Sequence, residues 1–292
     1  MSVPAPDARG RMTYDFSIVG VQKSGTTTLA WALRQHPDVC RPPRKEIHFF
    51  DREDYDWDSP DYARDYTAPR RAARHRMMGD ATPTYLFWPH ALERMHDYRP
   101  DMPLIAIFRD PLERLFSHWA HLRARVMPWV DWPKFIRRFA ETSLPAELPA
   151  GVKPVRYGHM SGIARGYYGE QLRRGFDVFP REQWLLLEFR EMFADFEGTL
   201  DAVTDHLELA RFAPHPPLSQ RNAGDAGVVG TPPTGEQLER IAAMYGQDLE
   251  LFAELSGIDT TAWPTRRILE GTLDPDELAA RFAAKINRGA ES

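Results

Sequence analysis

One short stretch combines the residue types that bind phosphate. Residues 20–28, Gly-Val-Gln-Lys-Ser-Gly-Thr-Thr-Thr, follow an apolar run and precede apolar residues at helical spacing. A glycine-bearing turn between a strand and a helix points backbone N–H groups outward at the positive end of the helix dipole, which stabilises an anion. We therefore predict a phosphate-binding loop, whose members are Lys23, Ser24, Gly25, Thr26, Thr27 and Thr28.

This loop differs from the common nucleotide-triphosphatase pattern, in which four residues separate two glycines and a lysine and Ser or Thr follow. Here Lys23 precedes Gly25. A simpler interpretation is a helix that follows a strand and begins with Ser or Thr as its N-cap. The lysine, the glycine and the run of threonines together favour phosphate binding.

A second group could move a proton. Polar and apolar residues alternate from Glu46 to Phe49, which predicts a short strand or an extended loop. Period-two geometry would place Glu46 and His48 on one face. A carboxylate beside an imidazole can act in general acid–base catalysis. The alternative is a surface Lys45–Glu46 pair with a histidine in the core, and the residues alone do not separate the two.

Arg109 follows the most apolar run of the chain, residues 103–108. Open α/β sheets bind ligands at the carboxyl ends of their strands, so an arginine at this position offers a rigid fork for a second phosphate. Asp110 and the following proline predict the capped start of a helix, and Ser117 lies two turns into it. The alternative is an arginine that pairs with Asp110 or with a helix end.

The elements that position these residues indicate an α/β fold. We predict a single P-loop-type domain, residues 14–292, with a central parallel sheet flanked by helices, preceded by a flexible tail, residues 1–13. Short apolar runs bounded by turns predict the strands, which are residues 16–19, 103–108 and 183–189. Helical patterns cover residues 89–97, 112–125, 193–207, 236–255 and 276–287.

The composition of the chain limits the classes of partner that it can bind. The chain has 292 residues, a hydrophobic fraction of 42% and a formal net charge of −5. Such a chain can bury a core, and it lacks the basic excess of a general nucleic-acid binder. We expect no nucleic-acid partner. Oligomeric state is left open.

The sequence shows no pattern that indicates a metal site or a membrane span. The single cysteine, Cys40, excludes an intramolecular disulfide and a cysteine-based metal cluster, and the ten histidines show no metal-ligand spacing. Residues 1–13 contain no apolar signal segment, and no window approaches the roughly 20 apolar residues of a membrane span. We expect no metal, no membrane span and a cytoplasmic location.

Five segments, taken in order, resemble a known family. They are Gly20–Leu29, Lys45–Asp51, Gly79–Leu86, Ile107–Ser117 and Gly166–Leu172. The first and fourth resemble the 5′-phosphosulfate and 3′-phosphate segments of sulfotransferases that use 3′-phosphoadenosine 5′-phosphosulfate (PAPS). The others resemble the heparan-sulfate-type branch and its bacterial carbohydrate or small-metabolite relatives.

The resemblance implies a role for each matching residue. Glu46 corresponds to the catalytic base, with His48 beside it, and Lys23 would stabilise the leaving phosphate. The loop from Lys23 to Thr28 would bind the 5′-phosphate and sulfate. The remaining cofactor contacts implied are Arg109 and Ser117 on the 3′-phosphate, Tyr168, and Arg221 in place of the family's basic loop near the C-terminus.

The resemblance further implies that a sulfuryl group passes from PAPS to a hydroxyl, and secondarily to an amine, of a carbohydrate or small-molecule acceptor, without a metal. The alternative function is a P-loop kinase or nucleotide hydrolase that uses Mg-ATP. A third is an inactive scaffold that binds phosphonucleotides. The aromatic and arginine-rich residues 55–76, together with residues 127–154, are expected to shape the acceptor pocket without identifying the acceptor.

Overall fold

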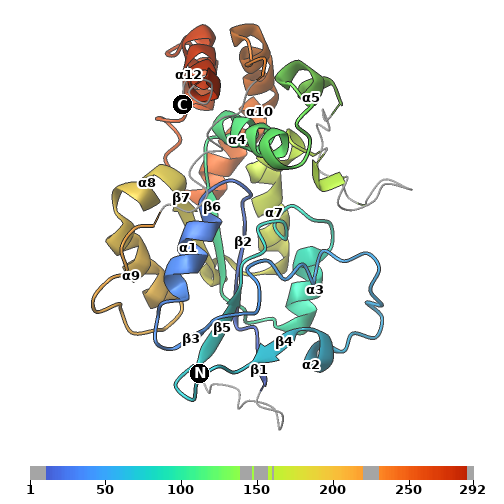
Figure 1. Cartoon of the computed structure of the whole chain (residues 1–292), viewed down its shortest axis with the longest axis vertical. Coiled ribbons are helices and arrows are strands. Elements are labelled where there is room, and N and C mark those ends of the chain that lie inside the picture. The colour runs from blue at the N-terminus through green and yellow to red at the C-terminus, as the bar shows by residue number, and fades with distance from the viewer. Residues whose placement is uncertain (1–10, 139–146, 148–156, 160, 220–229, 288–292) are drawn as a thin grey trace. The chain divides into compact units, whose positions relative to one another are not determined.

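A computed structural model describes residues 11–138, 147, 157–159, 161–219 and 230–287 (Figure 1). The chain divides into two compact units. The first unit is Met1–Phe108 with Gly175–Arg221, and the second is Arg109–Arg174 with Asn222–Ser292. Arg221, predicted as a cofactor contact, lies outside the described residues.

The first unit is built on a parallel sheet of five strands in the order β3-β5-β2-β6-β7. Its strands are β2 (Phe16–Gly20), β3 (Val39–Cys40), β5 (Met77–Asp80), β6 (Leu104–Phe108) and β7 (Trp184–Glu188). Every residue of β2 and β6 is buried, because both strands are apolar runs with neighbours on both sides. The predicted α/β fold with a central parallel sheet is confirmed.

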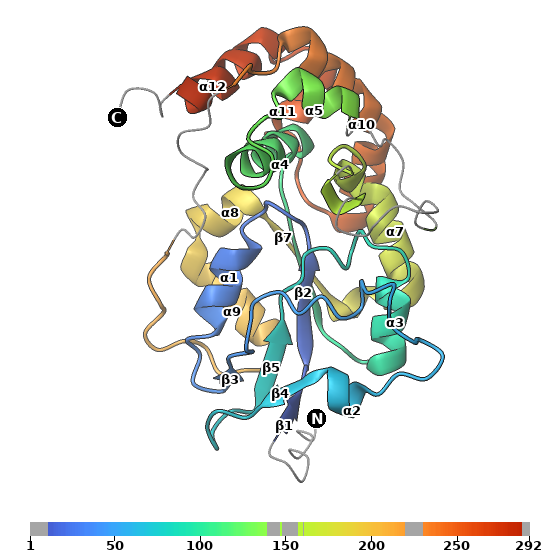
Figure 2. The ribbon, with the colours of Figure 1, turned by 45° about the vertical axis from the view of Figure 1, so that its right-hand side comes forward.

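Helices cover both faces of this sheet. Leu29 and Leu33 of α1 (Thr26–Leu33) share a buried cluster with Ile18 and Ile105 of the strands and with α8 (Phe189–Ala194) and α9 (Phe196–His206). Figure 2 shows α3 (Ala91–Tyr98) on the opposite face from α1. Apolar strands with both faces covered are typical of parallel sheets.

A small antiparallel pair lies beside the sheet. It consists of β1 (Arg11–Thr13) and β4 (Thr67–Pro69), and α2 (Tyr62–Asp65) precedes β4. Arg11–Thr13, the last part of the expected tail, are thus ordered, because their backbone pairs with β4 and the Arg11 side chain bonds to Thr67.

The predicted helix 193–207 is two helices. Glu188 caps α8 by accepting a hydrogen bond from the backbone N–H of Glu191. Asp195 then ends α8 and caps α9, since its side chain accepts from the N–H of Gly198 at 2.9 Å. An Asp cap competes with helix continuation, so one apolar pattern is divided at this residue.

The second unit is helical. Its helices are α4 (Pro111–Arg125), α5 (Trp132–Arg138), the 3₁₀ turn η1 (Ala164–Gly166), α10 (Gly235–Ser256), α11 (Pro264–Leu269) and α12 (Pro275–Asn287). The helix α7 (Tyr168–Val178) continues into the first unit, where the 3₁₀ turn η2 (Arg181–Gln183) precedes β7. The unit has its own core, in which Phe116 stacks on Phe282 with ring centroids 4.1 Å apart.

Candidate functional site

The predicted phosphate loop follows the central strand of the sheet. From β2 the chain runs to β3 and β5 on one side, then to β6 on the other side of β2. Such a switch in direction creates a ligand crevice at the carboxyl ends of the strands. The backbone N–H of Leu86 donates to the carbonyl of Val19 at 3.0 Å, so the segment after β5 packs against the start of the loop.

The loop backbone is shaped for an anion. Lys23 and Gly25 both adopt left-handed conformations, with φ of 72° and 83°. Gly25 is the N-cap of α1, and no side chain caps the helix. The first N–H groups of a helix have no intrahelical acceptor, and alternating backbone handedness directs such groups into one concavity. The loop therefore presents Lys23 and backbone donors together.

The side chains of the loop divide by burial. Lys23, Gly25 and Thr27 are half-buried, whereas Thr26 and Thr28 are buried. Ser24 has no exposed surface, and its hydroxyl finds no hydrogen-bond partner among the described residues. A buried polar atom without a partner is rare in proteins, and a bound ligand, ion or water is one way to satisfy it. Ser24 fits a hydroxyl that donates to a bound phosphate.

We expect Gly25→Ala to destabilise the first unit and weaken phosphate binding. An added Cβ would lie 2.6 Å from the Met192 side chain, and the positive φ adds about 1 kcal/mol for any L-residue. Gly257→Ala is the control, because that glycine has φ +70° and nothing within 4 Å. Chemical denaturation should show a larger loss for Gly25→Ala, and equal losses would contradict the steric argument.

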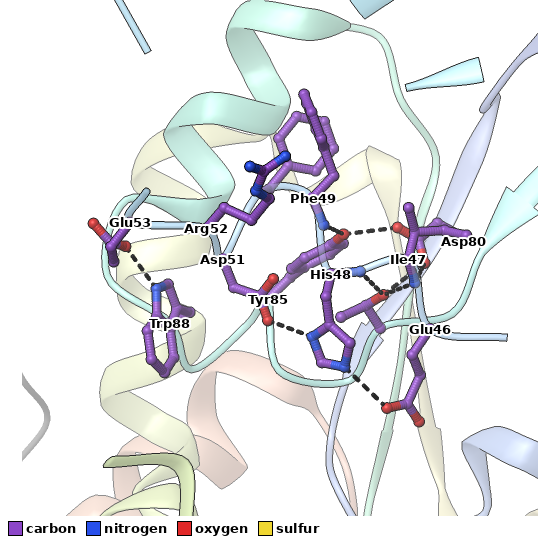
Figure 3. A network of polar contacts seen from close by, with 12 residues as sticks. Glu46, Ile47, His48, Phe49, Asp51, Arg52, Glu53, Asp80, Tyr85 and Trp88 are labelled. Atoms are coloured by element: carbon purple, nitrogen blue, oxygen red, sulfur yellow. Dashed lines mark hydrogen bonds and ion pairs between the residues drawn. The ribbon is translucent and has the colours of Figure 1, made fainter. Parts of the chain in front are cut away.

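Glu46, His48 and Asp51 form a linked group after β3 (Figure 3). His48 Nε2 lies 3.3 Å from Glu46 Oε2, and His48 Nδ1 lies 2.6 Å from Asp51 Oδ2. Lys45 Nζ donates to the other Glu46 oxygen at 2.5 Å. We call Glu46, His48 and Asp51 the Glu46 group.

Of the two structures predicted for residues 46–49, a short strand or an extended loop, the structure has a loop, and Glu46 and His48 meet as expected. These residues have no strand pairing, and His48 has a φ of 54°. Ile47 donates to Asp80 and Thr82 side chains, so the segment is fixed by side-chain acceptors at the carboxyl end of β5. The Glu46 group follows β3 in the chain, but its backbone is held at the carboxyl end of β5. Because β5 neighbours β2, the group and the phosphate loop lie at the carboxyl ends of adjacent strands.

Opposite charges hold the group in its ionised form. Partial burial raises the pKa of Glu46, but the hydrogen bond with His48 and the Lys45 charge outweigh it and lower that pKa to about 2. Hydrogen bonds to Asp51 and then Glu46 raise the pKa of His48 to about 10. At neutral pH the group is an imidazolium between two carboxylates.

These pKa shifts predict a pH-dependent stability. The raised pKa of His48 stabilises the fold fully below 6.5, its ordinary value, and this contribution is lost as pH rises through about 10. The unfolding free energies of wild type and His48→Gln should therefore converge between those pH values in urea titrations. A constant difference from pH 6.5 to 10 would contradict the assigned ion pairs.

Sequence reasoning missed Asp51. Its side chain is 8% exposed, and Oδ1 is buried without a hydrogen-bond partner among the described residues. Asp51 follows His48 by three residues, and a carboxylate at that distance beside a histidine was the available signal. The structure makes it the residue that orients the imidazole.

The predicted 3′-phosphate residues lie in the second unit. Arg109 comes directly after β6, and its Nε lies 3.4 Å from Glu113 Oε2. Asp110 caps α4 as predicted, accepting from the Glu113 N–H at 2.8 Å. Ser117 is half-buried within α4.

Tyr168 is a core residue of the second unit. It begins α7, has no exposed surface and packs edge-on against Phe252 and Trp263. Burial raises the pKa of its hydroxyl, and the neighbouring Arg114 charge lowers it. Its role as a cofactor contact stays a prediction.

The part of the chain that the structure describes holds no group of three or more His, Cys, Asp or Glu side chains placed to share an ion. Cys40 is a free, buried thiol, as expected of a small apolar residue.

Comparisons with known proteins define the class. Residues 13–214 match the sulfotransferase domain family. The crystal structure of a sulfotransferase from Alicyclobacillus acidocaldarius superposes with a TM-score of 0.68 and 26% identity, covering 86% of this chain and 99% of that chain. This chain therefore belongs to the sulfotransferase domain family, as the sequence predicted.

Two named relatives show which members of the family this chain is similar to. Heparan sulfate glucosamine 3-O-sulfotransferase 6 of Mus musculus is 31% identical over 210 residues, which cover 72% of this chain and 56% of the relative. Heparan sulfate glucosamine 3-O-sulfotransferase 3B1 of Homo sapiens is 32% identical over 194 residues, covering 66% and 46%. The chain thus spans about half the length of the curated relatives it matches.

The cytoplasmic location predicted from the sequence is wrong on these comparisons. A membrane-associated sulfotransferase of Dictyostelium discoideum is 31% identical over 108 residues, 36% of this chain and 22% of the relative. The prediction relied on missing apolar segments, and a missing segment does not assign a compartment. Within the described ranges, the helices all fall short of the length and apolarity needed to cross a bilayer.

Proposed function

We propose that this chain transfers a sulfuryl group from PAPS to a hydroxyl, and secondarily to an amine, of a carbohydrate or small-molecule acceptor. The observation that carries the proposal is that an anion-binding loop and an ionised carboxylate lie at the carboxyl ends of two neighbouring strands. A phosphate loop with a buried, unpartnered Ser24 hydroxyl follows β2, and the ionised Glu46 is fixed at the end of β5. Membership of the sulfotransferase family supports PAPS as the donor.

The loop would hold the donor by its 5′ end. Lys23, Ser24 and the backbone amides at the start of α1 suit the phosphate and sulfate oxygens. As the bond from sulfur to the phosphate oxygen breaks, negative charge builds on the leaving phosphate, and Lys23 would stabilise it. Arg109 and Ser117 would bind the 3′-phosphate, as the family resemblance implies.

Glu46 would receive the acceptor's proton. A carboxylate with a pKa of about 2 is ionised at neutral pH but is a weak base. It can take the proton once the new sulfur–oxygen bond has made the acceptor hydroxyl acidic. An acceptor hydroxyl that replaced the Lys45 contact would also remove a charge that lowers this pKa. His48, held by Asp51, would keep the carboxylate in place.

The acceptor is proposed to be a carbohydrate. The named relatives act on heparan sulfate glucosamine, and this supports a sugar hydroxyl. An aromatic cluster lies beside the Glu46 group, because Tyr55 and Trp57 pack on Phe49 with ring centroids 5.0 and 5.3 Å apart. Arg52 lies over the Tyr55 ring and Arg94 over the Trp57 ring, 5.0 and 4.5 Å from the ring centroids, so the cluster combines aromatic and cationic groups.

Asp110 argues against the Mg-ATP alternative. A kinase or nucleotide hydrolase needs an acidic metal ligand at a strand end, and Asp110 is the candidate. Both of its oxygens accept backbone hydrogen bonds, from Glu113 at 2.8 Å and from Thr265 at 2.7 Å. Burial, reinforced by the Glu113 charge, raises the pKa of Asp110 to about 6. These contacts assign Asp110 to helix capping.

Transfer of radiolabelled sulfate tests the proposal. The full chain is incubated with labelled PAPS and with heparan sulfate, its desulfated form or a monosaccharide glycoside, in EDTA. We expect label on at least one carbohydrate, with release of 3′-phosphoadenosine 5′-phosphate (PAP). Phosphate transfer in a parallel incubation with Mg-ATP and no EDTA, without sulfate transfer from PAPS, would contradict it.

A further inference from the structure

Asp80, the last residue of β5, is the centre of a buried polar network. It has no exposed surface. Its Oδ1 accepts the Thr82 hydroxyl at 2.6 Å, and its Oδ2 accepts the hydroxyls of Tyr66 and Tyr85 at 3.0 and 2.8 Å. Burial raises the pKa of Asp80, whereas these hydroxyl donors stabilise its ionised form. The mechanism above does not use this carboxylate.

The direction of these hydrogen bonds determines whether the hydroxyls can donate or accept further hydrogen bonds. A hydroxyl has a single proton, and here Thr82 and Tyr85 donate theirs to Asp80. Their oxygens are then left as acceptors for N–H groups. The Thr82 oxygen accepts from Ile47 and His48 at 3.0 and 3.4 Å, and the Tyr85 oxygen accepts from Phe49 at 3.0 Å.

The three amides are consecutive and surround the left-handed backbone of His48 (Figure 3). A φ of 54° is unfavourable for a residue with a Cβ and persists only where its surroundings impose it. This backbone places the imidazole between Glu46 and Asp51. The charges that face His48 are these two carboxylates, with Lys45 beside Glu46.

We propose that Asp80, Thr82 and Tyr85 are positioning residues that hold the Glu46 group in its working geometry through the backbone of residues 47–49. The inference rests on the proposed function, in which Glu46 is the base. Asp80 orients the hydroxyl protons of Thr82 and Tyr85. The oxygens of these hydroxyls accept hydrogen bonds from the three amides of residues 47–49, and those amides hold the backbone of His48. We call Asp80, Thr82 and Tyr85 the Asp80 hub.

Two tyrosines provide a matched test. Tyr66 and Tyr85 are both fully buried and both donate to Asp80 Oδ2, but of the two only Tyr85 accepts an amide of the 47–49 segment in the hydrogen bonds described. Tyr85→Phe should lower kcat for sulfate transfer to heparan sulfate about 10- to 100-fold, since small misplacements of a catalytic group have effects of that size. Tyr66→Phe should leave kcat unchanged, and the KM for PAPS should be unchanged in both.

Two substitutions of Thr82 provide a second, independent test. Thr82→Val keeps the shape but removes the acceptor of the His48 amide and the nearer acceptor of the Ile47 amide, which keeps only Asp80 Oδ1 at 3.4 Å. It should therefore lower kcat as Tyr85→Phe does. Thr82→Ser retains the hydroxyl and should restore activity. This pair keeps the proposal testable if Tyr85→Phe fails to fold.

The pKa of His48, measured by NMR, separates positioning from general loss of stability and needs no substrate. Its imidazole signals are assigned by their loss in His48→Gln. We expect wild type and Tyr66→Phe to titrate near pH 10, and Tyr85→Phe and Thr82→Val to titrate closer to 6.5. Folded Tyr85→Phe and Thr82→Val proteins with the wild-type His48 pKa would overturn the proposal. A shifted pKa in a protein whose wild type transfers no sulfate would support the hub and refute the function.

Discussion

Replacing Glu46 with glutamine is expected to lower kcat for sulfate transfer by about 10²- to 10⁴-fold, the usual contribution of a general base. Glutamine keeps the shape of the side chain but cannot accept the acceptor's proton. Binding of PAP should stay at the wild-type level, because Glu46 contacts Lys45 and His48 rather than the phosphate loop. Steady-state kinetics with labelled PAPS, together with calorimetric titration of PAP, measure the two effects separately.

Glu93→Gln is the control for this substitution, because Glu93 is exposed on α3 in the same unit. It should behave as wild type in both assays. A Glu46→Gln protein that turns over at the wild-type rate would remove Glu46 from the chemistry, and the Lys45–Glu46 pair would then be a surface ion pair.

Replacing Lys23 with alanine has the second large expected effect. We expect kcat to fall by about 10²- to 10³-fold, as on removal of one donor to developing charge, and PAP binding to weaken. The reason is that Lys23 is the cation of the phosphate loop and stands between β2 and the first turn of α1. Rapid-quench measurement of sulfate transfer reports the chemical step.

Two further variants control the Lys23 result. Lys23→Arg keeps the charge and should retain part of the affinity for PAP, whereas Lys285→Ala removes an exposed lysine from α12 and should have no effect. An unchanged rate and affinity in Lys23→Ala would show that the loop does not hold the leaving phosphate.

Local signals predicted much of the framework. The apolar residues of β6 followed by Asp110 and Pro111 predicted a buried strand and a capped helix, because each signal acts within a few residues. The split between α8 and α9 was missed although Asp195 is also a local cap, because the apolar pattern continues through it. The first strand and the loop after it were likewise readable from glycine, lysine and threonine.

The geometry of the Glu46 group could not be predicted in the same way. Alternation brought Glu46 and His48 to one face, but the observed backbone depends on acceptors that are 33 to 35 residues away, at Asp80 and Thr82. Such contacts exist only once β5 has joined the sheet. Asp51 is only three residues from His48, but its carboxylate acts on the imidazole only once the His48 backbone turns the ring toward it.

Calorimetric titration of the full chain with PAP in EDTA tests the central claim most directly, with Mg-ATP titrated in parallel. We expect PAP to bind without metal, Lys23→Ala and Arg109→Ala to weaken this binding, and Mg-ATP not to bind. Binding of Mg-ATP with no binding of PAP would contradict the assignment of PAPS as the donor, and Glu46 would lose its role as the base.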